Sequence, residues 1–229
     1  MNSVVAHATP APIKVLLTSF EAFGGENDNA SLEMVNSFRK QLAAGAPGLL
    51  SRAITLKIVV LPVVYGGDAE HPGAEDLLKA AIESFQPEVV ISFGQIVGET
   101  NFRLETEAFN LDDEPLPDNA GVVHTQVAIV PGGDDMLKTT LPAFTAVQAV
   151  HAAHLPARLS QSAGRYLCNH VFYSLLNLQK FHPTIRAAGF VHVPGLPAAG
   201  PHTPAAYQAQ GDWGAPAVAA ILNSVLKEL

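Results

Sequence analysis

The chain has 229 residues, of which 48% are hydrophobic and only 15% are charged, and its formal net charge is −8. This length suits one α/β domain with a substantial core, and the negative charge argues against nucleic acid as a partner because nothing supplies a basic stripe. The single cysteine excludes an intramolecular disulfide and fits a reducing cytoplasm, and no apolar run approaches the ~20 residues of a membrane helix.

The low charged fraction leaves little polar surface, which indicates a homo-oligomer that covers an apolar patch. Residues 1–12 have neither a basic n-region nor a sustained apolar core, so we expect a loose N-terminal tail there and a single α/β domain over residues 13–229. One cysteine and nine scattered histidines show no ligand spacing typical of zinc. With no cofactor motif in the chain, we expect no metal and no cofactor.

Short apolar runs alternate with helical patterns along the chain. From the N-terminus we expect a strand at Lys14–Thr18, a helix at about Leu32–Leu42, a strand at Ile54–Val64, a helix at Ala74–Ser84, strands at Glu88–Phe93, Asn101–Asn110 and His124–Val130, a helix at Met136–Ala153, a strand at Arg158–Ser160, a helix from Leu167 to Leu178, a strand at Ala187–Val193 and a helix at Ala215–Leu229. This alternation predicts an α/β fold, a three-layer α/β/α sandwich with a mostly parallel, twisted central sheet.

Three local features refine this prediction. Pro62 interrupts the second strand, which favours an edge position or a bulge. Asn29 and Ser31 are both candidates for the N-cap of the first helix. The segment Leu111–Gly121 is acidic and carries two prolines, so we expect a surface loop.

Cys168 follows a Ser162-Ala163-Gly164 turn and falls in the first turn of a predicted helix. Unpaired backbone N–H groups and the positive end of the helix dipole stabilise a thiolate there and lower its pKa below the free value near ~8.5. We therefore interpret Cys168 as a candidate nucleophile. The alternative is a small core residue, because cysteine is often buried.

The residues that follow the predicted strands include candidate binding and catalytic side chains, which we expect at one edge of the sheet. Phe20 and Phe23 follow the first strand, Gln95 follows the third, and His192 ends the last, and ligands of open α/β sheets bind beyond the carboxyl ends of strands. A nucleophilic cysteine needs a base, and His192 is the best placed histidine. The alternatives are a hydrogen-bonded core histidine and ordinary core packing of the phenylalanines.

Other histidines and two glutamates complete the candidates. His124 lies at the edge of a loop without an obvious partner, and His170 is two residues from Cys168 on the same helix, so it points to a different side. A carboxylate that holds the imidazole would complete a triad, and Glu105 or Glu107 could serve. The two glutamates share a strand face, so their spacing does not choose between them.

Four blocks of sequence, in order, match a known family: VLLTSFEAFGGENDNAS, GQIVGETNFRLETEAFNLDD, SAGRYLCNHVFYSLL and GFVHVPGLP. From about Lys14 onward the chain resembles the pyroglutamyl-peptidase I, or pyrrolidone-carboxylate peptidase, family. The resemblance implies an α/β/α sandwich with a Cys-His-Glu triad, and a cytoplasmic homotetramer that needs no cofactor. It also implies N-terminally pyroglutamylated peptides as substrates.

Carried over by position, the resemblance implies that Cys168 is the nucleophile and His192 the base. It places the acid on Glu105, because the block from Gly94 to Asp113 aligns without a gap. It also implies a set of residues that bind the pyroglutamyl ring: Phe20, Phe23, Gln95, Tyr166 and Leu167.

The chain departs from the family at three positions that usually hold arginine, namely Glu99, Thr106 and Pro115, and Arg103 is a candidate to compensate from nearby. The leading hypothesis is a cysteine exopeptidase, an omega-peptidase that hydrolyses the amide bond after an N-terminal pyroglutamyl residue. One alternative is a cysteine amidase or peptidase of shifted acyl specificity, suggested by the missing arginines. The other is a catalytically silent relative that binds a lactam.

Overall fold

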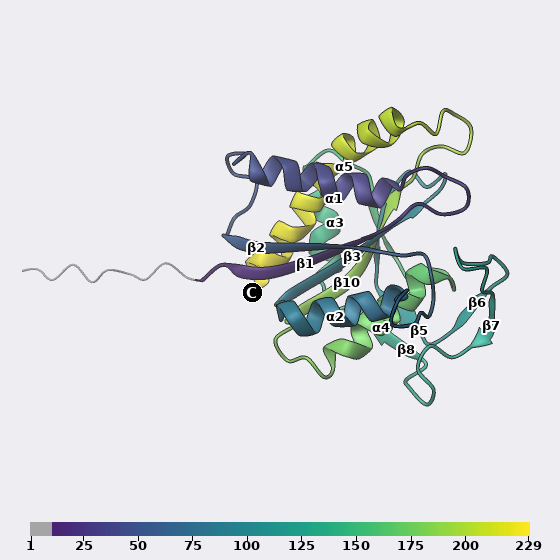
Figure 1. Ribbon diagram of the computed structural model, residues 1–229. Coiled ribbons are helices and arrows are strands. Elements are labelled where there is room, and N and C mark those ends of the chain that lie inside the picture. Colours follow the sequence, from purple (N-terminus) through teal and green to yellow (C-terminus); the bar gives the residue numbers. More distant parts are fainter. Residues whose placement is uncertain (1–10) are drawn as a thin grey trace, which may run out of the picture.

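The computed structural model describes residues 11–229, so residues 1–10 of the expected tail lie outside the described residues. The helices and strands follow in chain order (Figure 1): β1 Ile13–Phe20, α1 Ala30–Ala43, β2 Ile54–Leu61, α2 Ala74–Phe85, β3 Val89–Ile96, β4 Phe102–Glu105, β5 Glu107–Phe109, β6 Asp112–Glu114, β7 His124–Val127, β8 Met136–Lys138, α3 Ala143–Ala152, β9 Ala157–Ser160, α4 Leu167–Gln179, β10 Ala187–Pro194 and α5 Pro204–Glu228.

One mixed sheet forms the centre of the molecule, with the strand order β2-β1-β3-β10-β4-β9. Strands β2, β1, β3 and β10 are parallel, whereas β4 is antiparallel to β10 and β9 runs parallel to β4. The predicted mostly parallel sheet is therefore confirmed. Strand β2 is an edge strand that stops at Leu61, and this agrees with the interruption expected at Pro62, which has no N–H to give to a ladder.

Helices cover both faces of this sheet. Helices α1, α3 and α5 lie on one face, and α2 and α4 lie on the other (Figure 1). The alternation of side chains along β1 divides the core accordingly: Val15 and Leu17 pack on the first face, and Leu16 and Phe20 on the second. Strands β1 and β10 are buried almost throughout because both of their faces are covered. The predicted three-layer sandwich is confirmed.

The helix expected over Met136–Ala153 is wrong in its first half. Residues Met136–Lys138 form strand β8, which pairs with β5, and helix α3 begins only at Ala143. Pro142 explains the boundary, since a proline inside a helix removes one hydrogen bond and clashes with the preceding turn, whereas it is tolerated at a helix start. The sequence carried this signal at Pro142.

The acidic segment Leu111–Gly121 is not wholly a surface loop. It contains β6, which pairs with β7, and the side chains of Asp112 and Asp118 are buried. Asp118 accepts hydrogen bonds from the backbone N–H groups of Tyr65, Ala120 and Val122. These buried acceptors fold the acidic segment back onto the protein, against the residues that follow β2.

The starts of helices α1 and α5 can be compared with the sequence predictions. Asn29, one of the two expected caps, is the N-cap of α1, and its side chain accepts a hydrogen bond from the N–H of Ser31. The C-terminal helix begins at Pro204 rather than Ala215, with Thr203 as its N-cap. Pro216 lies within this helix without ending it, and the extra turns pack against α1.

Candidate active site

Cys168 lies in the first turn of α4, as the sequence predicts. The preceding turn contains Gly164, whose φ of 84° is a left-handed conformation that favours glycine. Tyr166 is the N-cap residue and makes no side-chain cap hydrogen bond, so the first N–H groups of the helix have no capping partner. Beyond the first turn, Val171 and Leu175 bury α4 against the sheet and fix its start in place.

Gly94 places the sulfur of Cys168 and the imidazole of His192 on the same face of the sheet. A Cβ atom placed on Gly94 would lie 2.9 Å from Cys168 Sγ, so only glycine leaves room for the sulfur over this part of β3. Gly94 is the register partner of His192 on the neighbouring parallel strand β10. Paired residues of adjacent strands project to the same face and stand about 5 Å apart, so the sulfur lies over the face from which His192 projects.

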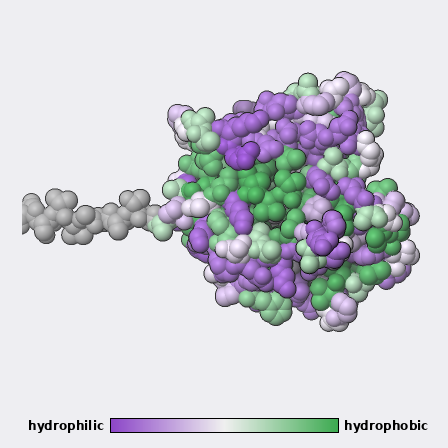
Figure 2. Space-filling view, in the orientation of Figure 1, coloured by the Kyte–Doolittle hydropathy of each residue, from purple (hydrophilic) through white to green (hydrophobic). Residues whose placement is uncertain are grey.

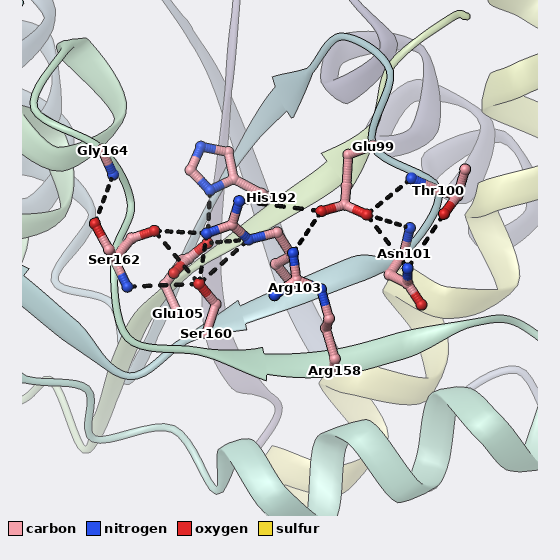
Figure 3. Close-up of polar contacts among 10 residues, drawn as sticks. All are labelled: Glu99, Thr100, Asn101, Arg103, Glu105, Arg158, Ser160, Ser162, Gly164 and His192. Carbon is pink, nitrogen blue, oxygen red and sulfur yellow. Dashed lines mark hydrogen bonds and ion pairs between the residues drawn. The ribbon is translucent and has the colours of Figure 1, made fainter.

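His192 is held by a buried carboxylate. Its Nδ1 lies 2.8 Å from Glu105 Oε1 (Figure 3). Both side chains are almost fully buried. Glu105 ends β4, and Arg103 Nε lies 3.2 Å from the same Oε1 atom. Burial is the main reason that the pKa of His192 is lowered from its ordinary value, although Glu105 opposes this effect. The imidazole is therefore neutral at pH 7 and able to accept a proton.

The structure separates the two glutamates that spacing left tied. Glu105 contacts His192, whereas Glu107 belongs to the next strand, β5, and pairs in register with Lys138 of β8. The expectation that both share a face of one strand is wrong, because the chain leaves the central sheet at Thr106 and β5 pairs elsewhere. Only Glu105 of the two is placed to orient the imidazole.

A pocket beside Cys168 collects every residue expected to bind the ring. It encloses about 270 Å³, counting the open space at its mouth, and is lined by Phe20, Phe23, Asn29, Val63, Gln95, Tyr166, Leu167 and Cys168. Sequence reasoning missed Val63, which follows β2, and considered Asn29 only as a helix cap. Asn29 carried a usable signal, because it stands a few residues after the Phe20–Phe23 turn.

The prediction for His170 is confirmed, and the prediction for His124 is wrong. His170 does point away from the pocket, to Asp112 at 2.8 Å and Glu75 at 3.6 Å. His124 is not without a partner: its Nδ1 lies 3.0 Å from Asp112, and its ring stacks on Tyr65. Burial lowers the pKa of His170, but the contacts to Asp112 and Glu75 outweigh burial and raise it to about 9. Asp112, which contacts both histidines, lies in the segment that the sequence assigned to a surface loop, whereas Glu75 lies in α2.

Residues 11–229 contain neither a candidate metal site nor a candidate membrane span. Within that range no three or more His, Cys, Asp or Glu side chains are grouped so that they could hold a metal ion. None of the helices in the same range is both long and apolar enough to cross a membrane.

Comparison with known families decides the relationship. The family model described as pyroglutamyl peptidase matches residues 13–209. The chain belongs to the pyroglutamyl peptidase family. It is 39% identical over 184 residues to a pyrrolidone-carboxylate peptidase of Klebsiella pneumoniae, covering 80% of this chain and 79% of that one. It is 35% identical over 206 residues to that of Escherichia fergusonii, covering 90% and 85%.

Solved structures of pyroglutamyl peptidases share this fold. The pyrrolidone carboxyl peptidase of Fervidobacterium islandicum matches with a TM-score of 0.76 at 31% identity, over 94% of this chain and 99% of that one. The pyroglutamyl peptidase I of Bacillus amyloliquefaciens matches with a TM-score of 0.73 at 28% identity, over 93% and 97%. The likeness extends over nearly the whole described chain.

The three positions where the resemblance leads us to expect arginine lie in different surroundings. Glu99 forms an ion pair with Arg158 at 2.7 Å. Thr106 donates a hydrogen bond to the carbonyl oxygen of Ser160. Pro115 lies between β6 and β7. Of the three, Glu99 is the one that contacts Arg103 directly (Figure 3).

The thiol itself departs from the sequence expectation. Cys168 is partly exposed, but burial of its sulfur and the nearby Glu105 carboxylate raise the pKa of the thiol to about 12. The lowered pKa expected from the helix start is wrong, because burial and a negative neighbour outweigh the first-turn N–H groups. At pH 7 the thiol of Cys168 and the imidazole of His192 are therefore both uncharged.

The raised pKa of the Cys168 thiol predicts how its alkylation depends on pH. Because the thiolate reacts and the pKa of the thiol is raised, the rate of iodoacetamide labelling at Cys168 should rise steadily from pH 7 to beyond pH 9. The same protein unfolded in urea serves as the control, and its labelling should level off above the ordinary pKa near ~8.5. A plateau between about pH 5 and 8 in the folded protein would instead show a thiolate–imidazolium pair and contradict the expectation.

Proposed function

We propose that this protein is a cysteine exopeptidase that hydrolyses the amide bond after an N-terminal pyroglutamyl residue. In this proposal Cys168 is the nucleophile, His192 the general base and acid, and Glu105 the carboxylate that orients His192. One observation carries it: a small pocket lined largely by apolar side chains holds the only cysteine of the chain and adjoins the buried His192–Glu105 pair. Membership of the pyroglutamyl peptidase family supports the same reaction.

The pocket has the chemistry of a neutral, flat lactam. Phe20, Phe23 and Leu167 supply apolar surface, and a pyroglutamyl cap carries no α-ammonium group that would need a charged partner. Gln95 accepts a hydrogen bond from the N–H of Ala30 through Oε1, so its amide orientation is fixed. Its Nε2 is buried and makes no hydrogen bond of normal length among the described residues, and it faces the Tyr207 hydroxyl. We assign this N–H group to the lactam carbonyl.

A second recess adjoins the pocket and suits the rest of the peptide. It shares Phe23, Gln95, Tyr166 and Cys168 with the pocket, and His192 and Arg103 also line it. Since the two recesses meet at Cys168, a substrate with its ring in the first would place its scissile carbonyl at the sulfur. The leaving peptide would then extend past His192, which is the group that must protonate it.

The reaction proceeds in two halves. In the first, Cys168 transfers its proton to His192 as the sulfur bonds to the carbonyl carbon, and the first-turn N–H groups of α4 stabilise the oxyanion. The C–N bond then breaks, and His192 gives its proton to the leaving amine. In the second half, water gives a proton to His192 and attacks the thioester. The C–S bond breaks, pyroglutamic acid leaves, and the proton returns to the sulfur.

A substrate panel tests the acyl specificity. A prolyl amide lacks the lactam carbonyl and leaves Gln95 Nε2 unpaired, so its kcat/KM should be on the order of 10⁴-fold below that of the pyroglutamyl amide. Release of a chromogenic amine measures both substrates. Gln95→Met is the matched variant. It should lower kcat/KM for the pyroglutamyl amide but not for the prolyl amide, so the ratio of the two kcat/KM values should fall.

The same panel decides between the proposal and its alternatives. The positions Glu99, Thr106 and Pro115 favour a shifted acyl specificity as the second candidate, because arginine is usual at each in the family that the chain resembles. A preference for the prolyl amide or another N-acyl amide would establish that candidate and refute the pyroglutamyl assignment. A lactam that binds while every amide in the panel stays intact would indicate a catalytically silent binding protein.

We also propose that the protein is a cytoplasmic homotetramer, as the family resemblance implies. The single cysteine supports a reducing compartment. Figure 2 shows a hydrophobic patch between α1 and α2, over the edge strand β2, where Val60 is 41% exposed and Leu56 and Ile58 are half-buried beside Leu42. An apolar patch on an unpaired sheet edge supports burial against another subunit.

A further inference from the structure

Arg103 occupies an unusual position beside the proposed triad. It lies on β4 as the register partner of His192 and stands two residues before Glu105. Its side chain is only 19% exposed and lines the recess that also holds Cys168 and His192. An arginine buried this far needs acceptors for its N–H groups, and their identity indicates its role.

The guanidinium group contacts two parts of the site at once (Figure 3). Its Nε lies 3.2 Å from Glu105 Oε1, the atom that also accepts from His192. Its Nη2 donates to Ser160 Oγ at 2.6 Å and to the carbonyl oxygen of Ser162 at 2.7 Å. Ser162 belongs to the turn that leads into the cysteine helix. The guanidinium group of Arg103 therefore connects the Glu105 carboxylate to the turn that precedes Cys168.

Glu99 holds the other side of Arg103. Its Oε2 lies 4.0 Å from Arg103 Nη1 and 2.7 Å from Arg158 Nη2. Burial opposes ionisation of Glu99, but hydrogen bonds from Asn101, Thr100 and Arg158 lower its pKa to about 2. Glu99 is thus a fixed anion, and Arg103 is held between two carboxylates in a single orientation.

We propose that Arg103 is a positioning residue that joins the Glu105 carboxylate to the turn before Cys168 and so keeps the acid, the imidazole and the sulfur in register. This inference rests on the proposed function. Glu105 needs such a partner because its side chain is fully buried and its Oε2 has no hydrogen-bond partner among the described residues. The fork geometry of arginine suits the task, whereas a lysine ammonium is a single point charge.

Arg103 also acts on the charge state of His192. The titratable and charged groups that face His192 are Glu105 and Arg103 on β4, Glu99 on the β3–β4 connection, and the Cys168 thiol on α4. Burial and the positive charge of Arg103 lower the pKa of His192, and the two carboxylates raise it. Removal of Arg103 therefore raises the pKa of His192, so the imidazole becomes protonated at a higher pH.

Two substitutions separate charge from geometry. In Arg103→Met, kcat for a pyroglutamyl amide should fall on the order of 10- to 100-fold, with KM changed less, because the triad loses its register. The acid limb of kcat/KM should also move up by roughly 0.5 to 1 pH unit. Arg103→Lys keeps the charge without the fork, so its acid limb should stay near that of the wild type while its kcat remains low.

Arg158→Met is the matched control. Arg158 also pairs with Glu99 at this edge, but no contact joins it to Glu105 or Ser162, so its kcat and acid limb should change far less than those of Arg103→Met. Circular dichroism checks that each variant is folded. If Arg103→Met does not fold, the kcat of Arg103→Lys tests the proposal instead. An unshifted acid limb with kcat within about two-fold of the wild type in Arg103→Met would overturn the proposal. Equal effects of Arg103→Met and Arg158→Met would do the same.

The wild-type assay keeps this inference distinct from the proposed function. If the wild type releases no amine from any pyroglutamyl amide, the proposed function fails before Arg103 is tested. If the wild type is active and Arg103→Met behaves like it, only the role of Arg103 fails.

Discussion

Cys168→Ala is expected to abolish release of a chromogenic amine from a pyroglutamyl amide, with kcat lower on the order of 10⁶-fold. The reason is that the sulfur beside Gly94 is the proposed nucleophile, and no other cysteine exists in the chain to replace it. Triad members act as a unit, so loss of the nucleophile costs nearly the whole catalytic contribution. Stopped and continuous amine-release assays measure the change.

Cys168→Ser is the matched variant, because it keeps a side chain of similar size at the helix start. It should also be nearly inactive, since a hydroxyl is a much weaker nucleophile than a thiol in this setting. Both variants should still bind a pyroglutamyl ligand in the pocket, which calorimetry can measure. If Cys168→Ala retained most of its activity, the nucleophile would have to be another group.

Glu105→Gln is expected to lower kcat by roughly 10³- to 10⁴-fold, the range known when the acid of a serine protease triad becomes an amide. Glu105 Oε1 lies 2.8 Å from His192 Nδ1, so the carboxylate fixes which nitrogen carries the proton. The amide removes the charge that stabilises the imidazolium formed during attack. The same amine-release assay, run across pH, measures the loss.

Glu107→Gln provides the control for this experiment. Glu107 lies two residues further along the chain but on β5, in register with Lys138, and makes no contact with His192. Its kcat should stay within about two-fold of the wild type. A large loss in Glu107→Gln together with a small one in Glu105→Gln would reverse the assignment of the acid.

The correct parts of the sequence prediction share a physical basis. Buried parallel strands read as continuous apolar runs, so β1, β3 and β10 were found with their ends within a few residues. Phe20 and Gln95, which lie at the carboxyl ends of β1 and β3, are therefore predicted at one sheet edge from the direction of the strands. The residue patterns alone therefore predict the ring-binding residues and His192 at the same edge of the sheet.

The wrong parts involve segments whose structure depends on distant partners. Strand β8 exists because β5 is available to pair with it, and nothing within Met136–Lys138 announces that partner. His124 meets Asp112 only because β6 and β7 pair, so neither spacing nor composition revealed the contact. The raised pKa of Cys168 likewise reflects what surrounds the sulfur in space.

The sequence by itself determined the layered α/β fold, the cysteine at a helix start and the aromatic residues after the first strand, because these depend on local periodicity and on the direction of parallel strands. Spacing left Glu105 and Glu107 open and the family resemblance favoured Glu105, whereas the tertiary structure shows the contact of Glu105 with His192. Only the tertiary structure placed Arg103 between Glu105 and the turn before Cys168. The reason is that β4 runs antiparallel to β10, and a strand's direction and register are set by its neighbours rather than by its own residues.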